Sequence, residues 1–398
     1  MRIAVVSPFV DRRHGSERAI AELIERLAAT YGCEVHLFAQ RVADLRLGSA
    51  DSVGVPLSSG GSVRWHRVPA IFGPQLLQFS AWFVLNRLWR SRSAFDLVLS
   101  PGINCLDADV VIVHALFSRL AEVSESNVYA NEPRSGILRN LHRRAYYSLL
   151  RALEHKVYRA PDVAIAAVSR RTASLLTRYF HRDDIRVIAN GVDSSAFSPE
   201  LRLVRRESSR SRRGLQPHEF VLLLIGNDWA TKGIHAVFES MALLPKLPLR
   251  LMIVGGDVRE PFATAAEKLG VLDRCLWNAP TEDILDCYAV ADVYVSPSRE
   301  DSFALPVAEA MALGLPAITS VSAGVSEFVA DRVNGFVLQD PRDSQALAQI
   351  ITQLYEDAAL RSRIGRAASA AAHLWSWDAN AAAVWQLLSE TAARKAQH

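Results

Sequence analysis

The stretch ADVYVSPSREDSFALPVAEAMALGLP, residues 291–316, decides the fold. It begins with a short apolar, β-branched run of the kind that forms a buried strand. Pro306 stands where a first helical residue is tolerated, because its missing N–H would lack an acceptor there anyway, and Gly314 stands where a helix ends. The stretch therefore predicts a strand, an acidic loop and a helix over 306–313.

This loop places polar groups around the start of the predicted helix. The backbone N–H groups near Leu305, Val307 and Ala308 are expected at the positive end of the helix dipole, which favours a phosphate. Asp301 in the loop and Glu309, expected in the first helical turn, can both face a ligand there. A carboxylate beside a diphosphate suits sugar hydroxyls, so the pattern indicates a nucleotide-sugar. A purely structural interpretation stays open, because the dipole alone favours Glu in a first turn.

The rest of the chain alternates strand and helix patterns. Residues 2–7, 18–32 and 34–40 read as strand, helix and strand, the opening of a parallel, doubly wound sheet. Further strands are predicted at 63–68, 95–100, 109–114, 163–168 and 185–188, then at 220–226, 249–256, 291–298 and 316–320, with helices near 232–244, 259–269, 281–289, 306–313 and 376–395. Two similar α/β halves are implied, with a turn-rich break near 190–200.

Composition restricts the class of protein. The 398 residues suffice for two domains, and charged residues make up 22%. The net charge of +3 is nearly balanced, which disfavours nucleic acid as a partner. No run reaches the roughly 18 to 20 apolar residues of a membrane span, and residues 1–10 lack a signal-peptide cleavage site, so they predict a first core strand.

The four cysteines, Cys33, Cys105, Cys275 and Cys287, are scattered without metal-ligand spacing. They predict reduced core thiols of a cytoplasmic protein, and no metal site is expected.

The spacing of Asp301 and Glu309 resembles the carboxylate-x7-Glu signature of the family 4 retaining glycosyltransferases of the GT-B fold. There the first acidic residue meets the sugar and the second the ribose. The family usually has Glu first; here Asp301 holds that place with Glu300 just before it, and both remain candidates for the sugar contact. The resemblance implies that the donor lies against Glu300, Asp301, Ser302, Phe303, Ala304, Leu305, Pro306, Val307 and Glu309.

GNDWATKG, residues 226–233, carries a second match. Lys232 corresponds to the family lysine that binds the donor diphosphate, and Asn227 lies in the same loop. Most members have an Arg a few residues earlier, which is absent here; this shorter form resembles lipopolysaccharide-core glucosyltransferases.

Weaker matches extend the donor contacts. Gly15 and Ser16 resemble the family's paired-glycine loop at the diphosphate, with His14 in place of the first Gly. His114, at the end of 108–114, coincides with a family histidine that contacts the transferred sugar, although a histidine at a strand end is more often structural. AGVSE, residues 323–327, resembles a GG-x-x-E segment and places Glu327 near the same site.

The resemblance implies two Rossmann-like domains facing each other across a cleft. They are expected to be residues 1–190 with the returning helix 376–398, which take the acceptor, and residues 191–375, which take the nucleotide-sugar. The implied activity is metal-independent, retaining transfer of a sugar from a UDP- or GDP-sugar to a glycan or lipid-linked acceptor in bacterial-type polysaccharide or glycolipid synthesis. His114, Lys232, Asp301 and Glu309 are the expected catalytic residues, and no cofactor is needed.

Three questions stay open. Six arginines in 202–213 predict either a solvated connecting helix or a contact with an acidic ligand or membrane. Residues 76–92 and 134–159 mix aromatics and arginines, which fits helices on the inner face of an anionic membrane equally with core-facing helices. The alternative functions are a non-catalytic sugar-nucleotide-binding partner and a sugar-nucleotide epimerase; a Rossmann dehydrogenase is disfavoured because G-x-G-x-x-G is missing.

Overall fold

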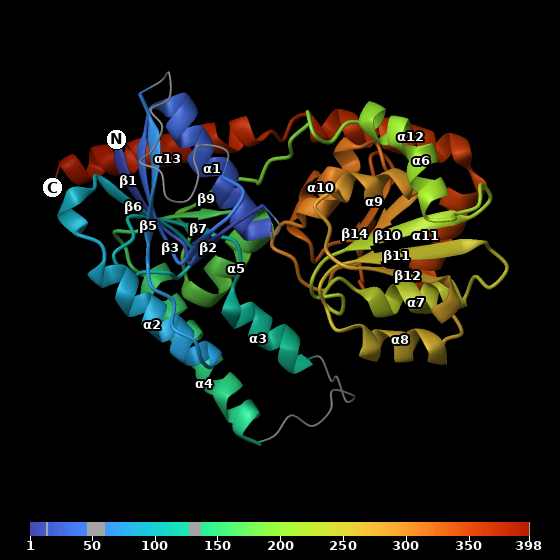
Figure 1. Ribbon diagram of the computed structural model, residues 1–398, viewed down its shortest axis with the longest axis horizontal. Helices are drawn as coiled ribbons and strands as arrows, with labels where there is room; N and C mark the ends of the chain where they lie inside the picture. The colour runs from blue at the N-terminus through green and yellow to red at the C-terminus, as the bar shows by residue number, and fades with distance from the viewer. Residues whose placement is uncertain (13–14, 46–59, 127–136, 398) are drawn as a thin grey trace. The chain divides into compact units, whose positions relative to one another are not determined.

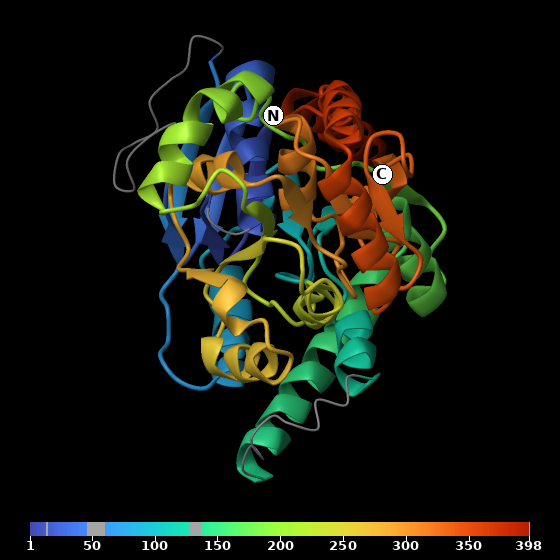
Figure 2. The same ribbon diagram turned by 90° about the vertical axis from the view of Figure 1, so that its right-hand side faces the viewer.

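The computed structural model describes residues 1–12, 15–45, 60–126 and 137–397. It divides the chain into two compact units: unit 1 comprises 1–191 and 377–398, and unit 2 comprises 192–376 (Figures 1 and 2). The boundaries expected from the sequence, at 190 and 376, fall within one residue of this division.

Unit 1 is built on a parallel sheet of apolar strands. The order is β5-β3-β1-β6-β7-β8-β9, with β1 (Arg2–Val6), β3 (Glu34–Ala39), β5 (Ser62–Arg67), β6 (Leu97–Pro101), β7 (Val110–Val113), β8 (Ala164–Ala167) and β9 (Ile185–Val187). Two short strands, β2 (Phe9–Val10) and β4 (Arg41–Val42), pair separately. Ile3 to Val6 are fully buried, which explains the unbroken apolar run of β1, because helices cover a parallel sheet on both faces.

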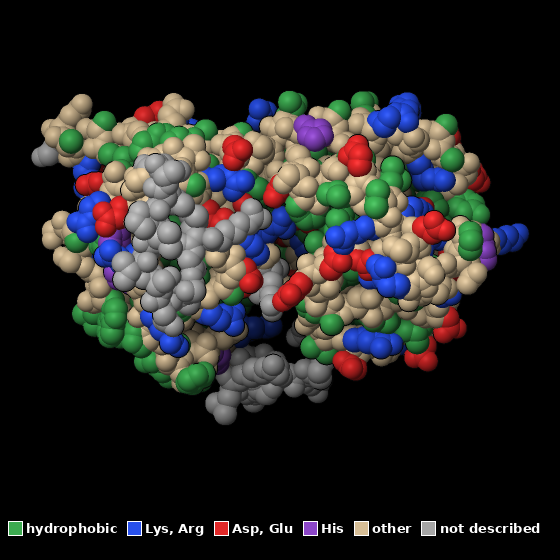
Figure 3. Space-filling model, turned by 45° about the horizontal axis from the view of Figure 1, so that its top comes forward, with side chains coloured by type: hydrophobic (Ala, Val, Ile, Leu, Met, Phe, Trp, Pro, Cys, Tyr) green, Lys and Arg blue, Asp and Glu red, His purple; other side chains and the backbone are tan. Residues whose placement is uncertain are grey.

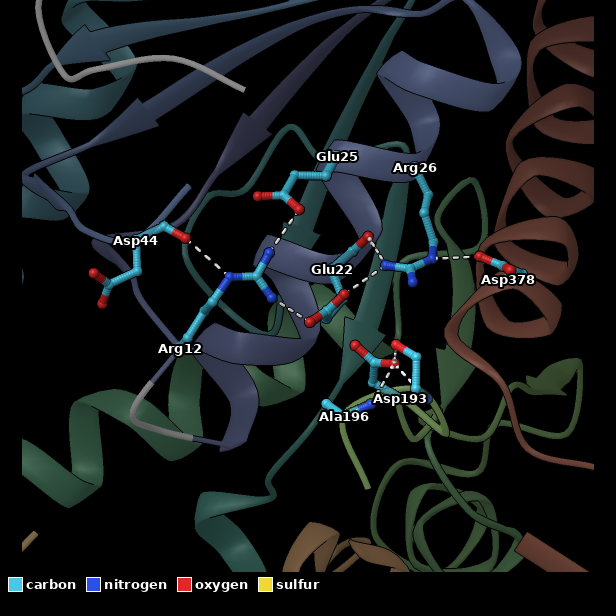
Figure 4. A network of polar contacts seen from close by, with 9 residues as sticks. Arg12, Glu22, Glu25, Arg26, Asp44, Asp193, Ala196 and Asp378 are labelled. Carbon is cyan, nitrogen blue, oxygen red and sulfur yellow. Dashed lines mark hydrogen bonds and ion pairs between the residues drawn. The ribbon is translucent and has the colours of Figure 1, made fainter. Parts of the chain in front are cut away.

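The helices of unit 1 are α1 (Gly15–Tyr31), α2 (Gln75–Leu88), α3 (Phe117–Ser126), α4 (Ile137–Tyr158), α5 (Arg170–Phe180) and α13 (Trp377–Ala396), with a short 3₁₀ turn η1 (Arg92–Ala94). The returning helix α13 packs on α1, where Tyr31 and Trp385 stack with ring centroids 5.1 Å apart. A network of ion pairs supports the same helix (Figure 4): Arg12 bridges Glu22 and Glu25, and Arg26 bridges Glu22 and Asp378. These contacts join α1, near the N-terminus, to the C-terminal helix α13.

Unit 2 repeats this architecture. Its parallel sheet has the order β12-β11-β10-β13-β14-β15, from β10 (Phe220–Ile225), β11 (Leu249–Val254), β12 (Cys275–Asn278), β13 (Val293–Val295), β14 (Ala317–Ser320) and β15 (Phe336–Leu338). The helices are α6 (Pro199–Arg212), α7 (Ile234–Ala242), α8 (Arg259–Lys268), α9 (Ile284–Val290), α10 (Leu305–Ala312), α11 (Ser344–Glu356) and α12 (Ala358–Ala372), with 3₁₀ turns η2 (Leu272–Arg274) and η3 (Gly324–Phe328). Helices α7 and α8 cover one face, and α9 and α10 the other (Figure 1).

The strand order of unit 2 locates a ligand crevice. Strands β10 and β13 are neighbours in the sheet although two strands separate them in the sequence, so the winding reverses direction between them. Open α/β sheets bind ligands outside the carboxyl ends of the strands at such a switch point. The loops after β10 and β13, which begin at Gly226 and Ser296, therefore flank the expected binding position.

The sequence patterns did not predict α11, α12, β12 or β15. Strand β15 has only three residues, too few for a clear alternation. Helix α12 packs on α10 through glycine: a Cβ on Gly365 would stand 2.2 Å from the Gly314 carbonyl oxygen. Such a contact depends on the close approach of two backbones, which hydrophobic periodicity does not report.

The arginines of 202–213 form neither a solvated connector nor a free cationic surface. Helix α6 packs on α9. Arg206 binds Asp292 at 2.5 Å and the Ala291 carbonyl at 2.8 Å, and Arg210 donates to the Val290 carbonyl at 2.9 Å. The remaining partners are the Leu313 carbonyl for Arg202, Asp283 for Arg205, and Asp286 for Arg212 and Arg213. The segment forms the predicted helix, but its arginines were expected to be solvated and instead have partners about 70 to 110 residues away.

The cysteines and the surface charges can also be compared with the sequence-based expectations. All four cysteines are buried and free, as predicted. Basic and acidic side chains are interspersed on the face shown in Figure 3. In the described part of the chain, no helix is long and apolar enough to cross a membrane.

Candidate functional site

Lys232 and Asp301 meet at the switch point of unit 2. Lys232 follows β10, Asp301 follows β13, and the Lys232 ammonium forms an ion pair with the Asp301 carboxylate. The two side chains are only 18% and 14% exposed, so most of each lies below the surface. Two residues that the sequence predicted separately therefore form one cluster at the position where this fold binds ligands.

Glycine positions the lysine. A Cβ on Gly226 would stand 2.9 Å from the Lys232 stem, and a Cβ on Gly233 only 2.2 Å from the Pro297 carbonyl oxygen. Gly233 also has a φ of 83°, a left-handed conformation that suits glycine. Lys232 itself lies in the turn before α7, which begins at Ile234; the sequence had placed it at the helix start.

The loop before Lys232 is held by its own polar side chains. Asp228 accepts hydrogen bonds from the Thr231 amide at 2.9 Å and the Thr231 hydroxyl at 2.7 Å. Asn227 accepts one from the Gly256 amide at 2.9 Å, so its side-chain oxygen supports the loop. The Arg299 amide donates to the Thr231 carbonyl at 2.8 Å, which ties this loop to the one that carries Asp301.

The Asp301 loop is fastened to a neighbouring segment. The Asp301 amide donates to the Ser322 carbonyl at 3.1 Å, and its carbonyl accepts from the Gly324 amide at 2.9 Å. The Asp301 carboxylate also accepts from the Phe303 amide at 3.2 Å. These bonds fix the backbone of Asp301 and leave its carboxylate facing Lys232. Glu300 is 7% exposed, so of the two candidates for the sugar contact it is the more buried.

The start of α10 differs in detail from the expectation. The helix begins at Leu305, with Pro306 second, and Ala304 before it has a φ of 72°. The Val307 amide is not free, because it donates to the Ala304 carbonyl at 3.0 Å. Phe303, Ala304 and Leu305 are buried, and Val307 is fully buried.

Glu309 lies in the second turn of α10, and the prediction of a first-turn position was wrong. Its side chain is buried, and the Tyr288 hydroxyl lies 2.7 Å from one carboxylate oxygen and 3.1 Å from the Pro306 carbonyl. Tyr288 itself is fully buried on α9. Sequence reasoning missed Tyr288, because an apolar helix with one tyrosine gives no sign that its hydroxyl reaches a carboxylate on another helix. Glu327 lies exposed in η3 and Ser302 is half-buried.

The predicted residues of unit 1 lie at a helix start and at a strand end. Gly15 and Ser16 form the exposed start of α1, and His14 lies outside the described residues. His114 follows β7; its Nε2 is buried and lacks a hydrogen-bond partner within the described ranges. Burial lowers the pKa of His114 to about 4, so the ring is neutral near pH 7 and its buried nitrogen can accept or donate one hydrogen bond.

Metal ligands do not gather around these residues. Within the ranges that the structure describes, no group of three or more His, Cys, Asp or Glu side chains could hold a metal ion.

Comparison with known proteins identifies the family. The family model described as Glycosyltransferase Family 4 matches residues 13–196, and the model of the group 1 glycosyl transferases matches residues 205–371. Each model thus covers most of one unit. The chain is a family 4 glycosyltransferase. It is an enzyme of the GT-B type, which confirms the expected fold of two Rossmann-like parallel-sheet domains and favours a transferase over an epimerase or a non-catalytic partner.

Two relatives with different named activities match this chain. The D-inositol 3-phosphate glycosyltransferase of Xylanimonas cellulosilytica is 29% identical over 403 residues, 94% of this chain and 91% of that protein. The lipopolysaccharide glucosyltransferase WaaG of Escherichia coli is 29% identical over 160 residues, 39% of this chain and 42% of that protein. The second match covers less than half of either glycosyltransferase.

Solved structures share the fold. The crystal structure of WaaG, a glycosyltransferase involved in lipopolysaccharide biosynthesis, superposes with a TM-score of 0.77 at 18% identity, over 97% of this chain and 99% of that one. Anabaena Alr3699/HepE in complex with UDP-glucose gives 0.71 at 18% identity, over 98% and 100%. At this identity, both matches establish the GT-B architecture alone.

Proposed function

We propose that this glycosyltransferase moves a sugar, with retention at the anomeric carbon, from a UDP- or GDP-sugar to a glycan or lipid-linked acceptor in cell-surface polysaccharide or glycolipid synthesis. The observation that carries the proposal is the Lys232–Asp301 pair at the carboxyl ends of β10 and β13. One cation and one carboxylate at a switch point match the two parts of a nucleotide-sugar, its diphosphate and its sugar hydroxyls.

The reaction requires stabilisation of a leaving diphosphate. The bond between the anomeric carbon and the phosphate oxygen breaks, and its electron pair leaves with the diphosphate. The Lys232 ammonium and the first amide of α10, at Leu305, would stabilise that charge. The acceptor hydroxyl oxygen bonds to the anomeric carbon from the same face, and its proton passes to the departing phosphate.

The carboxylates would hold the donor in place. Once the diphosphate binds the Lys232 ammonium, the ion pair with Asp301 would break. The Asp301 carboxylate would then accept hydrogen bonds from the sugar hydroxyls. Glu309, oriented by Tyr288, would accept the ribose hydroxyls. In unit 1 the family resemblance supports His114 at the transferred sugar and Gly15 and Ser16 at the diphosphate. We further propose that transfer needs no metal ion or other cofactor and that the enzyme acts in the cytoplasm.

The test is transfer itself. A panel of UDP-, GDP- and ADP-sugars is incubated with the enzyme in EDTA, without and with acceptors, and free nucleoside diphosphate is measured. Because one relative is named for D-inositol 3-phosphate and another for lipopolysaccharide, the acceptors are D-inositol 3-phosphate and deacylated lipopolysaccharide core. We expect one donor to be consumed and the product to keep the donor's anomeric configuration by NMR. Inverted product, or a strict metal requirement, would contradict the proposal.

A further inference from the structure

Helices α3 and α4 of unit 1 enclose a cationic groove that the donor chemistry does not use. The two helices lie side by side in both views (Figures 1 and 2) and pack on each other. The groove between them has a volume of about 700 Å³. Among the described residues, Ala121 lines it from α3, and the charged and polar ones lie on α4: Arg143, Arg144, Tyr147, Ser148, Arg151 and His155.

The described side chains that line the groove do not neutralise its charge. None of the described lining residues is acidic. Arg143 and Arg144 are exposed, and neither has a hydrogen-bond or ion-pair partner in the described part of the chain. A pair of unpartnered guanidinium groups in a hollow is a binding position for an anion, because arginine presents its donors in a fork that fits carboxylate and phosphate oxygens.

Two acids of α3 and α4 that the structure describes are engaged elsewhere. Glu154 on α4 is fully buried and accepts hydrogen bonds from the Phe117 and Ser118 amides at 2.6 and 2.8 Å, which caps the start of α3. Glu122, next to Ala121, binds Arg119 at 3.2 Å. These carboxylates stabilise the helix pair and leave the groove's arginines for an external ligand.

The spacing indicates a ligand with several anionic groups. From Arg143 to Arg151 the helix advances eight residues, about 12 Å at 1.5 Å per residue. The cations are thus spread along the groove, with the hydroxyls of Tyr147 and Ser148 between them. Phosphate groups suit this mixture, because each offers several acceptor oxygens to guanidinium and hydroxyl donors together.

The hollow in which the arginines lie argues against a membrane surface as the occupant. Membrane-surface helices present large apolar side chains beside their cations. Here Tyr146 of α4 packs against Phe79 of α2, with ring centroids 6.1 Å apart. Among the described side chains of these helices, the exposed large apolar residues are Leu141 on α4 and Leu77, Val84 and Leu88 on α2. The arginines line a hollow facing α3 instead, where a bounded anionic chain fits better than a flat bilayer.

We infer that the α3–α4 groove binds the phosphate groups of a phosphorylated saccharide, the acceptor of the transfer reaction. The acceptor role rests on the proposed function; the anion site does not. The groove would hold the acceptor by its phosphates and leave its sugar hydroxyls free to react.

The test measures binding of tripolyphosphate by calorimetry at low salt. The matched variants are Arg143→Gln/Arg144→Gln, Arg363→Gln and Lys232→Ala. Arg363 is an exposed arginine of α12 without a partner in the described chain, so its loss removes a charge but no groove contact. We expect the double variant to lose the groove binding, which should weaken at least about tenfold because hydrogen bonds to charged groups are lost, and Arg363→Gln to bind as the wild type does. In Lys232→Ala, any tripolyphosphate held at the donor site is lost and the groove binding remains.

Conservative variants and other probes sharpen the result. Arg143→Lys/Arg144→Lys keeps the charge but loses the fork, so intermediate affinity supports the assignment. Three results would overturn it: equal binding by the double glutamine variant, loss of binding in Lys232→Ala alone, or equal affinity for tri-galacturonate, which carries carboxylates. If the enzyme bound phosphatidylglycerol vesicles through these arginines but did not bind tripolyphosphate, the groove would be a membrane contact instead.

The two proposals can fail separately. If tripolyphosphate binding depends on Arg143 and Arg144 but no donor sugar is turned over, the anion groove stands and the proposed transfer reaction fails. If a donor is turned over but tripolyphosphate binding does not depend on Arg143 and Arg144, the reaction stands and the groove assignment fails.

Discussion

Helices α4 and α6 are both rich in arginine, yet they use it in opposite ways. On α6, Arg206 and Arg210 bind the carboxylate of Asp292 and backbone carbonyls at the end of α9. On α4, Arg143 and Arg144 lack partners within the described residues and face a groove. The comparison teaches that arginine content does not indicate a ligand site. The location of each charge's partner does.

The donor site contains a cation that is both paired within the protein and placed to bind a ligand, and its substitution should have the largest effect on activity. Lys232 has a partner in Asp301, as the α6 arginines have theirs, but it lies at a ligand position. Lys232→Ala should lower the rate of nucleoside diphosphate release by about 10² to 10³, because a preorganised cation at the leaving group is lost. The measurement is the initial rate at saturating donor. A rate within threefold of the wild type would place Lys232 with the purely structural charges.

The structural side of the comparison is tested by Asp292→Ala. This substitution leaves two partly buried arginines without their carboxylate and also removes the acceptor of the Val221 amide. Unfolding in urea should show a loss of about 3 kcal/mol or more. The control is Asp283→Ala, which breaks the exposed pair with Arg205 and should cost at most about 1 kcal/mol. Equal losses would mean that the α6 pairs do not hold α6 on α9.

His114, whose Nε2 is buried and lacks a partner among the described residues, should make stability depend on pH. The pKa of His114 is about 4 because of burial, below the value of about 6.5 expected in the unfolded chain. The unfolded state therefore binds more protons between these values, and the stability that neutral His114 permits is lost as the pH falls from about 6.5 to 4. Urea unfolding at pH 7 and at pH 4.5 measures this loss. Between these two pH values, the free energy of unfolding of His114→Gln should fall less than that of the wild type, by up to about 3 kcal/mol. Parallel losses would contradict the assignment.

The smallest effect is expected on α4. Arg143→Gln/Arg144→Gln removes two exposed charges that have no partners among the described residues, so the free energy of unfolding should change by less than about 0.5 kcal/mol. A clear destabilisation in urea would show that these arginines hold unit 1 together, and the contrast with α6 would fail.

The sequence predicted what depends on local pattern. The strand at 2–7 was recognisable because a strand covered on both faces is apolar throughout, and the structure has β1 at Arg2–Val6. Lys232 and Asp301 were recognisable because each follows such a strand in a motif of fixed spacing.

The remaining features depend on contacts between distant segments. The Lys232–Asp301 pair joins residues 69 positions apart, and the Tyr288 hydroxyl reaches Glu309 from a different helix. The arginines of α6 gave the wrong prediction for the same reason, because only the folded chain brings Asp292 to Arg206. Local periodicity carries no record of such partners.

The most direct test measures stability and activity together in Lys232→Ala and Arg206→Gln. We expect opposite results: Lys232→Ala keeps its melting temperature within a few degrees but loses nucleoside diphosphate release, whereas Arg206→Gln melts several degrees lower yet keeps the wild-type rate at low temperature. If both variants lost activity and stability in the same proportion, the separation of a donor-binding lysine from structural arginines would be wrong.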